Sequence, residues 1–112
     1  MDCLFCKIVS GDIPSNKVYE DDNVLVFHDI DPKAPTHYLV IPKAHIQSAA
    51  EITPENEAVI GHIFSVIAKT ADKLGLQNGY RIVSNCGKDA QQSVGHIHFH
   101  VLGGRELAWP PG

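Results

Sequence analysis

The chain has 112 residues, of which 44% are hydrophobic and 20% charged, and its formal net charge at pH 7 is −4. These values predict one globular domain over residues 1–112 and argue against nucleic acid or an anionic membrane as a partner. No apolar run approaches the roughly 20 residues of a membrane span, and the first residues lack the pattern of a signal peptide. Three cysteines cannot all pair, so a reducing, cytoplasmic location is expected.

The first part of the chain predicts a short helix followed by three strands. Residues 1–12 are expected to form a short helical turn that ends at a Ser-Gly-Asp sequence. Val18–Tyr19 and Val24–His28 are rich in strand-forming residues and are separated by four polar residues, which predicts a β-hairpin. A third strand is expected over His37–Ile41, where Pro42 ends it.

The clearest helix is predicted from about Pro54 to Leu74, with Thr53 as its N-cap and Gly75 as its C-cap. Its apolar residues recur at spacings of three and four, as in an amphipathic helix. They are Ile60, Ile63, Phe64, Ile67, Ala71 and Leu74. Val59 and Val66 widen this stripe beyond one face, so the helix is expected to bury a second side in a dimer.

The last two strands are expected at Tyr80–Asn85 and His96–Leu102, joined by a polar loop. The chain thus predicts one long helix, short helical turns and five strands connected mostly by hairpins. This order of elements is typical of an α+β fold with a five-stranded antiparallel sheet.

Three histidines alternate with apolar residues in the sequence His96-Ile97-His98-Phe99-His100. On a β-strand this period sends all three imidazoles to one face, roughly 6.5–7 Å apart, and the apolar residues to a core. Imidazole can act near neutral pH as a base, an acid, a nucleophile or a metal ligand. The row therefore predicts a chemical surface, and a solvated strand face that is rich in histidine is the alternative.

With this triad, the sequence resembles the histidine triad (HIT) superfamily of nucleotide hydrolases and transferases, in its Hint branch. The resemblance covers nearly the whole chain. The further blocks that carry it are Leu4-Phe5-Cys6-Lys7-Ile8, Asp12-Ile13-Pro14, Phe27-His28-Asp29-Ile30, Ala34-Pro35-Thr36-His37, Val40-Ile41-Pro42-Lys43, Gly103-Gly104-Arg105 and Trp109-Pro110-Pro111-Gly112.

The resemblance implies a hydrolase that needs no cofactor for catalysis. His98 matches the nucleophile that attacks the α-phosphorus of a purine nucleoside phosphoramidate or related ester, and water then releases the nucleoside monophosphate from the imidazole. His100 and Ser93 match residues that supply or relay a proton to the leaving amine. His37 matches the histidine that supports the triad from the neighbouring strand, and His96 is the first triad member. A satisfied strand histidine is the alternative for His37.

The same resemblance implies a nucleotide site. Asp29 matches the carboxylate that accepts hydrogen bonds from the ribose hydroxyls. The apolar clamp around the base matches Leu4, Phe5, Ile8, Phe27 and Ile30, for which ordinary core packing is the alternative. The phosphate side matches Asn85, Gln92, Ser93, Val94, His98 and His100. Two positions depart from the family pattern: Gln91 replaces a glycine, which questions a need for positive φ there, and Gly95 replaces a frequent aromatic residue.

A metal site is also predicted. Cys3 and Cys6 have the Cys-x₂-Cys spacing of a tetrahedral zinc site, which needs two further ligands. Some bacterial HIT proteins complete such a site with histidines that match His45 and His96. Four protein ligands would make this Zn²⁺ structural, and two reduced thiols without metal are the alternative.

Several functions and assemblies stay open. The rivals are a dinucleoside polyphosphate hydrolase of the Fhit branch, a zinc-dependent hydrolase whose metal is held by His96, His98 and His100, and a nucleotide-binding regulator. The resemblance implies a homodimer in which the long helices and the Tyr80–Asn85 strands pair about a two-fold axis, giving one continuous sheet. The tail with Trp109 would then reach the partner's active site.

Overall fold

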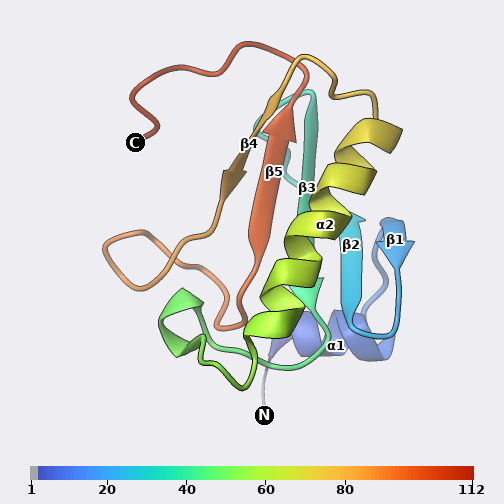
Figure 1. Cartoon of the computed structure of the whole chain (residues 1–112), viewed down its shortest axis with the longest axis vertical. Coiled ribbons are helices and arrows are strands. Elements are labelled where there is room, and N and C mark those ends of the chain that lie inside the picture. The colour runs from blue at the N-terminus through green and yellow to red at the C-terminus, as the bar shows by residue number, and fades with distance from the viewer. Residues whose placement is uncertain (1–2) are drawn as a thin grey trace.

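The computed structural model describes residues 3–112 (Figure 1). Two α-helices, one 3₁₀ helix and five strands follow one another along this part of the chain. They are α1 (Leu4–Ser10), β1 (Lys17–Glu20), β2 (Val24–His28), β3 (Thr36–Pro42), η1 (Ala49–Glu51), α2 (Glu57–Lys73), β4 (Tyr80–Val83) and β5 (Phe99–Gly103). None of these helices has the length and apolar character needed to cross a membrane.

The five strands form one sheet in the order β1-β2-β3-β5-β4, and every neighbouring pair is antiparallel. This confirms the predicted α+β fold with a five-stranded antiparallel sheet. Leu39 of β3 lies opposite His100 of β5, and Val101 lies opposite Ile82 of β4. The sheet therefore brings the end of the histidine triad beside the strand that carries His37.

The sheet is buried on both faces. Helix α2 packs on one face and α1 on the other (Figure 1). Alternate residues of one strand point to opposite faces, so the continuous apolar runs of β2 and β3 supply two cores. On the α2 side the sheet contributes Val24, Val26, Tyr38, Val40, Phe99 and Val101. On the α1 side it contributes Leu25, Phe27, Leu39 and Ile41.

Helix α1 is closed at both ends by local hydrogen bonds. The Cys3 thiol sulfur accepts from the backbone N–H of Cys6 at 3.2 Å, which caps the N-terminus. Gly11 has a φ of 86° and its N–H donates to the Ile8 carbonyl, which ends the helix. The short predicted helix is thus confirmed within the described residues, and Phe5 and Ile8 are its buried positions.

Helix α2 begins later than the sequence predicts. Its N-cap is Asn56 rather than Thr53, because the Asn56 side chain binds the Thr53 N–H and the Glu51 carbonyl and closes a separate turn that contains Pro54. The helix ends at Lys73 with Leu74 as its C-cap, one residue before the predicted end and the predicted cap. Gly75, with a φ of 81°, follows the helix and is the C′ residue of a Schellman motif.

The sequence predicted that Val59 and Val66 would give α2 a second apolar face. This prediction is wrong, because both valines pack against the core under the helix. Val66 is 1% exposed and belongs to the core under the helix, and Val59 packs partly against the same core. The helix also docks through polar atoms, since the Tyr38 hydroxyl lies 2.8 Å from the Thr70 hydroxyl oxygen. The exposed aromatic residue of α2 is Phe64, at 46%.

The two C-terminal strands are shorter than predicted. β4 ends at Val83, and β5 begins at Phe99, so His96 and His98 precede the strand. The N–H of Ile97 instead donates to the Ile46 carbonyl at 2.6 Å, outside the sheet. The alternation still holds, because Ile97 enters the α2-side core and the neighbouring imidazoles lie toward α1.

Candidate active site

A cavity of about 350 Å³ lies on the α1 side of the sheet. Its walls come from α1, the segment after α1, the end of β2 and the triad. Among the predicted site residues it is lined by Leu4, Phe5, Ile8, Phe27, Asp29, Ile30, Ser93, Val94, His98 and His100. The lining residues that sequence reasoning missed are Ile13, Pro14, Ser15, Asn16, His28 and Leu39. The Phe27-His28-Asp29-Ile30 block was the available signal for His28.

The apolar part of the cavity has a buried floor and an exposed rim. Phe5 and Phe27 form the floor, with ring centroids 5.7 Å apart and an edge-to-face angle of 71°. Leu4 is 46% exposed, and Ile30 is fully exposed at 100%. Core packing alone explains the floor, whereas an exposed leucine and isoleucine at one cavity are suited to covering a flat apolar ligand.

His98 is held in one tautomer by the main chain. Its Nδ1 lies 2.8 Å from the His96 carbonyl oxygen, which can only accept, so Nδ1 carries the proton. In the neutral ring, the lone pair is then on the other nitrogen, Nε2. The ring is 3% exposed and packs edge-to-face on Phe5 at 5.0 Å, and the Ser84 hydroxyl binds the His98 carbonyl at 2.9 Å. The main chain and Phe5 thus immobilise this imidazole with Nδ1 engaged, at the wall of the cavity.

His100 and His37 form a second imidazole pair. Nε2 of His37 lies 2.9 Å from Nδ1 of His100, and the rings of His98 and His100 lie 5.1 Å apart. Burial, together with the neighbouring imidazoles of His98 and His37, lowers the pKa of His100 to about 4. Burial also lowers the pKa of His37. Both side chains are therefore neutral at pH 7, so His100 donates or accepts hydrogen bonds there as an uncharged group.

Asp29 lies where the cavity meets this imidazole pair. Its Oδ1 accepts from the N–H of Asp31 at 2.8 Å, which fixes the carboxylate at the end of β2. Its Oδ2 lies 3.4 Å from Nε2 of His37, and the side chain is 18% exposed. Asp29 thus lines the cavity and contacts His37 with one carboxylate oxygen.

The loop before the triad is held by the side chain of Gln92. Its amide nitrogen donates to the carbonyls of Gln47 and Val94 at 2.8 and 2.9 Å, and its amide oxygen accepts from the N–H of Gly87 at 2.9 Å. These bonds orient the segment that carries Ser93. The Gln92 side chain itself is occupied by the loop, and neither Gln92 nor Asn85 is among the residues that line the cavity.

The two departures from the family pattern have structural explanations. Gln91 has a φ of 58°, so this position keeps the left-handed backbone that a glycine would favour, contrary to the doubt raised from the sequence. At Gly95, an added Cβ would lie 2.8 Å from Nε2 of Gln47. Gly95 therefore leaves room for a glutamine from the loop after β3.

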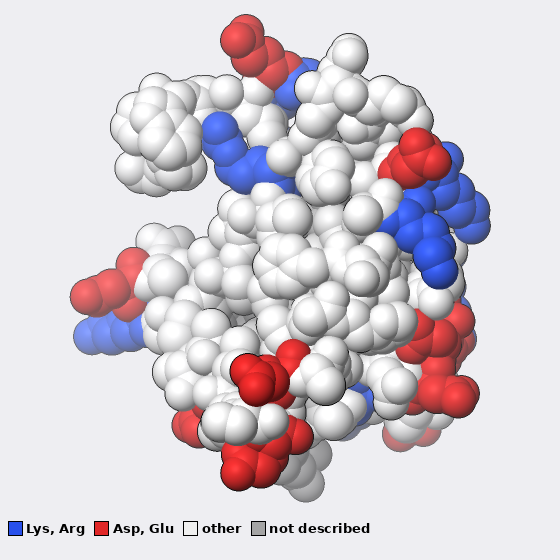
Figure 2. Space-filling view, in the orientation of Figure 1, with Lys and Arg blue, Asp and Glu red and all other residues white. Residues whose placement is uncertain are grey.

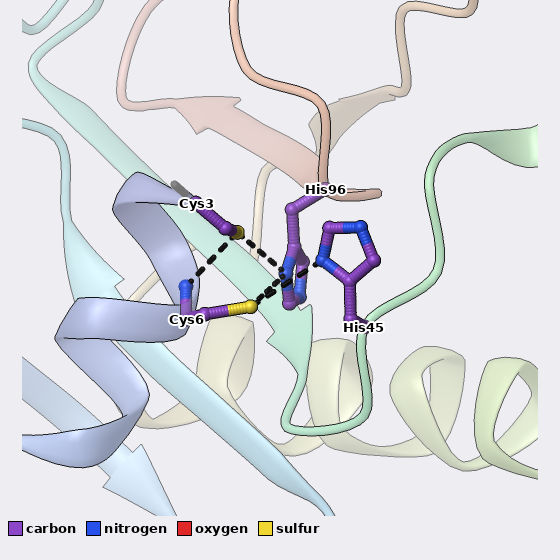
Figure 3. Close-up of side chains that lie close together, drawn as sticks. All are labelled: Cys3, Cys6, His45 and His96. Carbon is purple, nitrogen blue, oxygen red and sulfur yellow. Dashed lines mark hydrogen bonds between the residues drawn. The ribbon is translucent and has the colours of Figure 1, made fainter. Parts of the chain in front are cut away.

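Cys3, Cys6, His45 and His96 gather at the start of α1 (Figure 3). The ligand atoms of these four side chains all lie within 4.8 Å of one another. The Cys3 sulfur is 3.4 Å from Nδ1 of His96, and the Cys6 sulfur is 3.3 Å from Nδ1 of His45 and 3.6 Å from Nδ1 of His96. All three cysteines of the chain are free thiols, so Cys3 and Cys6 are not joined by a disulfide.

This cluster fits a tetrahedral zinc ion. Zn–S bonds near 2.3 Å and Zn–N bonds near 2.0–2.1 Å at tetrahedral angles place sulfur and nitrogen ligands about 3.6 Å apart. The Nε2–H of His96 donates to the Pro42 carbonyl at 2.8 Å, which turns the unprotonated Nδ1 toward the two sulfurs. Partial burial and the neighbouring Cys3 thiol raise the pKa of Cys6 to about 11. The raised pKa disfavours the thiolate that a metal requires, and a bound cation would offset this by stabilising the negative charge.

The architecture and the site together define a class: small α+β proteins with an imidazole cluster beside an apolar cavity. The profile of the HIT domain matches residues 10–107, and the chain belongs to the HIT family. It is 49% identical over 111 residues to an uncharacterized HIT-like protein of Synechococcus elongatus, covering 99% of this chain and 97% of that protein.

Two solved structures show the same fold. A HIT family hydrolase from Legionella pneumophila superposes with a TM-score of 0.97 at 46% identity, covering 99% of this chain and 100% of the other. A histidine triad protein from Clostridium difficile superposes with a TM-score of 0.93 at 50% identity, covering 96% and 95%. The superfamily predicted from the triad is thus confirmed, and the chain is hydrolase-like.

Proposed function

We propose that the protein hydrolyses purine nucleoside phosphoramidates or related nucleoside 5′-monophosphate esters, as in the Hint branch, through a covalent nucleotidyl-His98 intermediate. The observation that carries this proposal is the tautomer of His98, whose Nδ1–H is bound by a main-chain carbonyl and whose Nε2 is free at the cavity. The residue needs no activating base, because neutral imidazole is already the nucleophile.

The proposed reaction has two steps. In the first, the Nε2 lone pair of His98 attacks the α-phosphorus, the bond from phosphorus to the leaving nitrogen breaks, and that nitrogen gains a proton. His100 and Ser93, which line the same cavity, are placed to give or relay this proton. In the second step, water attacks the phosphorus and gives a proton back to the group that donated one in the first step. The P–Nε2 bond breaks, and nucleoside monophosphate leaves with His98 restored.

A direct comparison of substrates tests this function. Adenosine 5′-phosphoramidate is expected to be turned over faster than a diadenosine polyphosphate, the substrate of an Fhit-type hydrolase. Activity toward the phosphoramidate should survive a chelator. A preference for the dinucleotide would assign the Fhit branch, and loss of activity that added Zn²⁺ restores would favour the metal-dependent hydrolase.

The arrangement of the triad already argues against a metal held by all three of its histidines. Both ring nitrogens of His96 are engaged, Nε2 by Pro42 and Nδ1 by the cysteine sulfurs. His100 instead groups with Asp29 and His37. Among the described residues, His96 and His100 therefore belong to two separate clusters, and His98 belongs to neither.

We further propose that Asp29 reads the ribose, because its carboxylate lines the cavity next to the apolar clamp. Asp29→Asn is expected to weaken binding of adenosine monophosphate about tenfold, since hydrogen bonds to a charged acceptor contribute about 1.5–3 kcal/mol. Catalysis at saturation should remain measurable. Calorimetric titration checks the loss, and a 2′,3′-dideoxy nucleotide is the matched probe. Equal affinity of the parent protein for ribose and dideoxyribose nucleotides would remove this role.

Cys3, Cys6, His45 and His96 are proposed to hold a structural Zn²⁺. When bound, the ion would join the start of α1 to the loop after β3 and to the segment before β5. The ion would thereby hold the Phe5 ring in its edge-to-face contacts with the rings of His96 and His98, whose centroids lie 6.0 and 5.0 Å away.

A homodimer is also proposed, through the surface of α2 and β4 that the resemblance implies. β4 is an edge strand, and its Tyr80 is 38% exposed. Phe64 of α2, whose ring lies 5.6 Å from that of Phe99 in the neighbouring β5, is 46% exposed. Figure 2 shows that the area over α2 and the neighbouring strands carries few charged side chains, which lie around it. The tail extends from this side with Trp109 80% exposed (Figure 1). Pairing of two β4 edges would cover these groups.

Analytical ultracentrifugation at micromolar concentration tests the dimer. The expected mass is twice the 12.2 kDa of one chain. Phe64→Asp should shift the equilibrium toward the monomer, because a charge would be buried in an apolar contact. Lys69→Met, which changes a residue of α2 that contacts Tyr19, is the control and should leave the mass unchanged. A parent protein that sediments as 12.2 kDa would exclude the dimer and any role of Trp109 across it.

A further inference from the structure

The Gly103-Gly104-Arg105 segment after the triad packs against the loop between β2 and β3. Gly104 has a φ of 95°, and a Cβ at this position would lie 2.9 Å from Cβ of Pro35. This close approach places Arg105 beside the loop, where Nη2 donates to the carbonyl of Lys33 at 3.0 Å. Arg105 therefore fixes one peptide of a loop that is far from it in sequence.

The preceding peptide group, between Pro32 and Lys33, contacts the imidazole pair. The backbone N–H of Lys33 donates to Nδ1 of His37 at 3.0 Å. A backbone N–H cannot accept, so Nδ1 of His37 is unprotonated, and the neutral ring carries its proton on Nε2. Lys33 thus links the two side chains: its carbonyl accepts from Arg105, and its N–H donates to His37.

The proton on Nε2 of His37 has two acceptors in reach. Nδ1 of His100 lies at 2.9 Å and Oδ2 of Asp29 at 3.4 Å. The shorter contact makes His100 the main acceptor, so Nδ1 of His100 is unprotonated and its proton lies on Nε2. If His37 instead carried its proton on Nδ1, its Nε2 would accept from His100, and Nε2 of His100 would have no proton to donate. The two rings change tautomer together.

We propose that Arg105 and the main-chain amide of Lys33 are positioning groups that hold the His37–His100 pair in the tautomer with a proton on Nε2 of His100. This rests on the proposed function, in which that Nε2–H donates to the leaving nitrogen. The transfer breaks the N–H bond of His100 and forms one on the leaving group. The water that attacks in the second step gives a proton back to Nε2 of His100, which restores the neutral pair.

The kinetic test compares two leaving groups. A substrate with an alkylamine leaving group, which leaves poorly without a proton, should lose about tenfold in kcat in Arg105→Met, with little change in KM. A substrate with a nitroarylamine leaving group should change little. Arg105→Lys, which can still donate to the Lys33 carbonyl, should recover part of the loss. Lys73→Met is the control, because Lys73 also donates to a main-chain carbonyl, that of Val18 at 3.5 Å, away from the site.

The second readout is independent of turnover. Long-range ¹⁵N–¹H spectra of the full-length parent protein at pH 7 should show His37 and His100 both protonated on Nε2, and Arg105→Met should raise the Nδ1–H population of His100. An unchanged His100 tautomer in this variant, or equal slowing of both substrates, would overturn the proposal. A parent protein without phosphoramidase activity would refute the proposed function, and the spectra would still decide the tautomer of the pair.

Discussion

Replacing His98 by alanine is expected to reduce phosphoramidase turnover by about 10⁴-fold or more, since no other group can form the covalent intermediate. Binding of adenosine monophosphate should remain within a few-fold of the parent value. The apolar floor and Asp29 are unchanged in this variant, and they are the groups proposed to bind base and ribose. Steady-state kinetics and calorimetric titration measure the two quantities on the same preparation.

His62→Ala is the matched control for this variant. His62 is a partly exposed histidine of α2 that binds Asp21 at 2.7 Å, away from the cavity. It should keep parental turnover. If His98→Ala retained more than a small fraction of the activity, or if it lost nucleotide binding to the same extent as turnover, the nucleophilic role of His98 would be wrong.

The second large effect concerns the zinc site. An ion that binds the native state alone, at a free concentration of about 1,000 times its Kd, adds about 4 kcal/mol to the free energy of unfolding. For a chain of this size that corresponds to about 15 °C in Tm. Cys6→Ser, which removes one ligand, should therefore lower Tm by about this amount. A chelator should lower Tm of the parent similarly and have little further effect on the variant.

Cys86→Ser is the control for this experiment, because Cys86 is an exposed thiol outside the cluster. It should leave both Tm and the response to chelator unchanged. Metal analysis of protein purified without added zinc should find about one Zn²⁺ per chain. Metal-free protein whose Tm is indifferent to chelator would refute the structural ion.

The local sequence pattern predicted the fold well where interactions between neighbouring residues decide the structure. The apolar runs of β2 and β3 are read from neighbouring residues and are confirmed, and the end of α2 was predicted to within one residue. The start of α2 was wrong because Asn56 uses its side chain to close a preceding turn. The triad was predicted as strand throughout. Instead, Ile97 donates its N–H to the loop residue Ile46, a tertiary contact that local sequence does not reveal.

The candidate site, too, contains groups that the sequence predicted and groups that only the structure reveals. Residues recognised by their side chains, such as Asp29 and His98, are found from motifs. The groups that set the imidazole tautomers are mostly main-chain atoms, namely the carbonyls of His96 and Pro42 and the amide of Lys33. Any residue type supplies such an atom, so its position becomes visible only when the fold places it.

The central claim is that His98 carries the nucleotide during turnover, and intact-protein mass spectrometry tests it most directly. The parent protein is mixed with adenosine 5′-phosphoramidate and quenched in alkaline denaturant within the first turnover, because the P–N bond is labile in acid. The account predicts a transient species heavier by one adenylyl group, mapped to His98 and absent in His98→Ala. Turnover without any adduct, or an adduct on another residue, would contradict it.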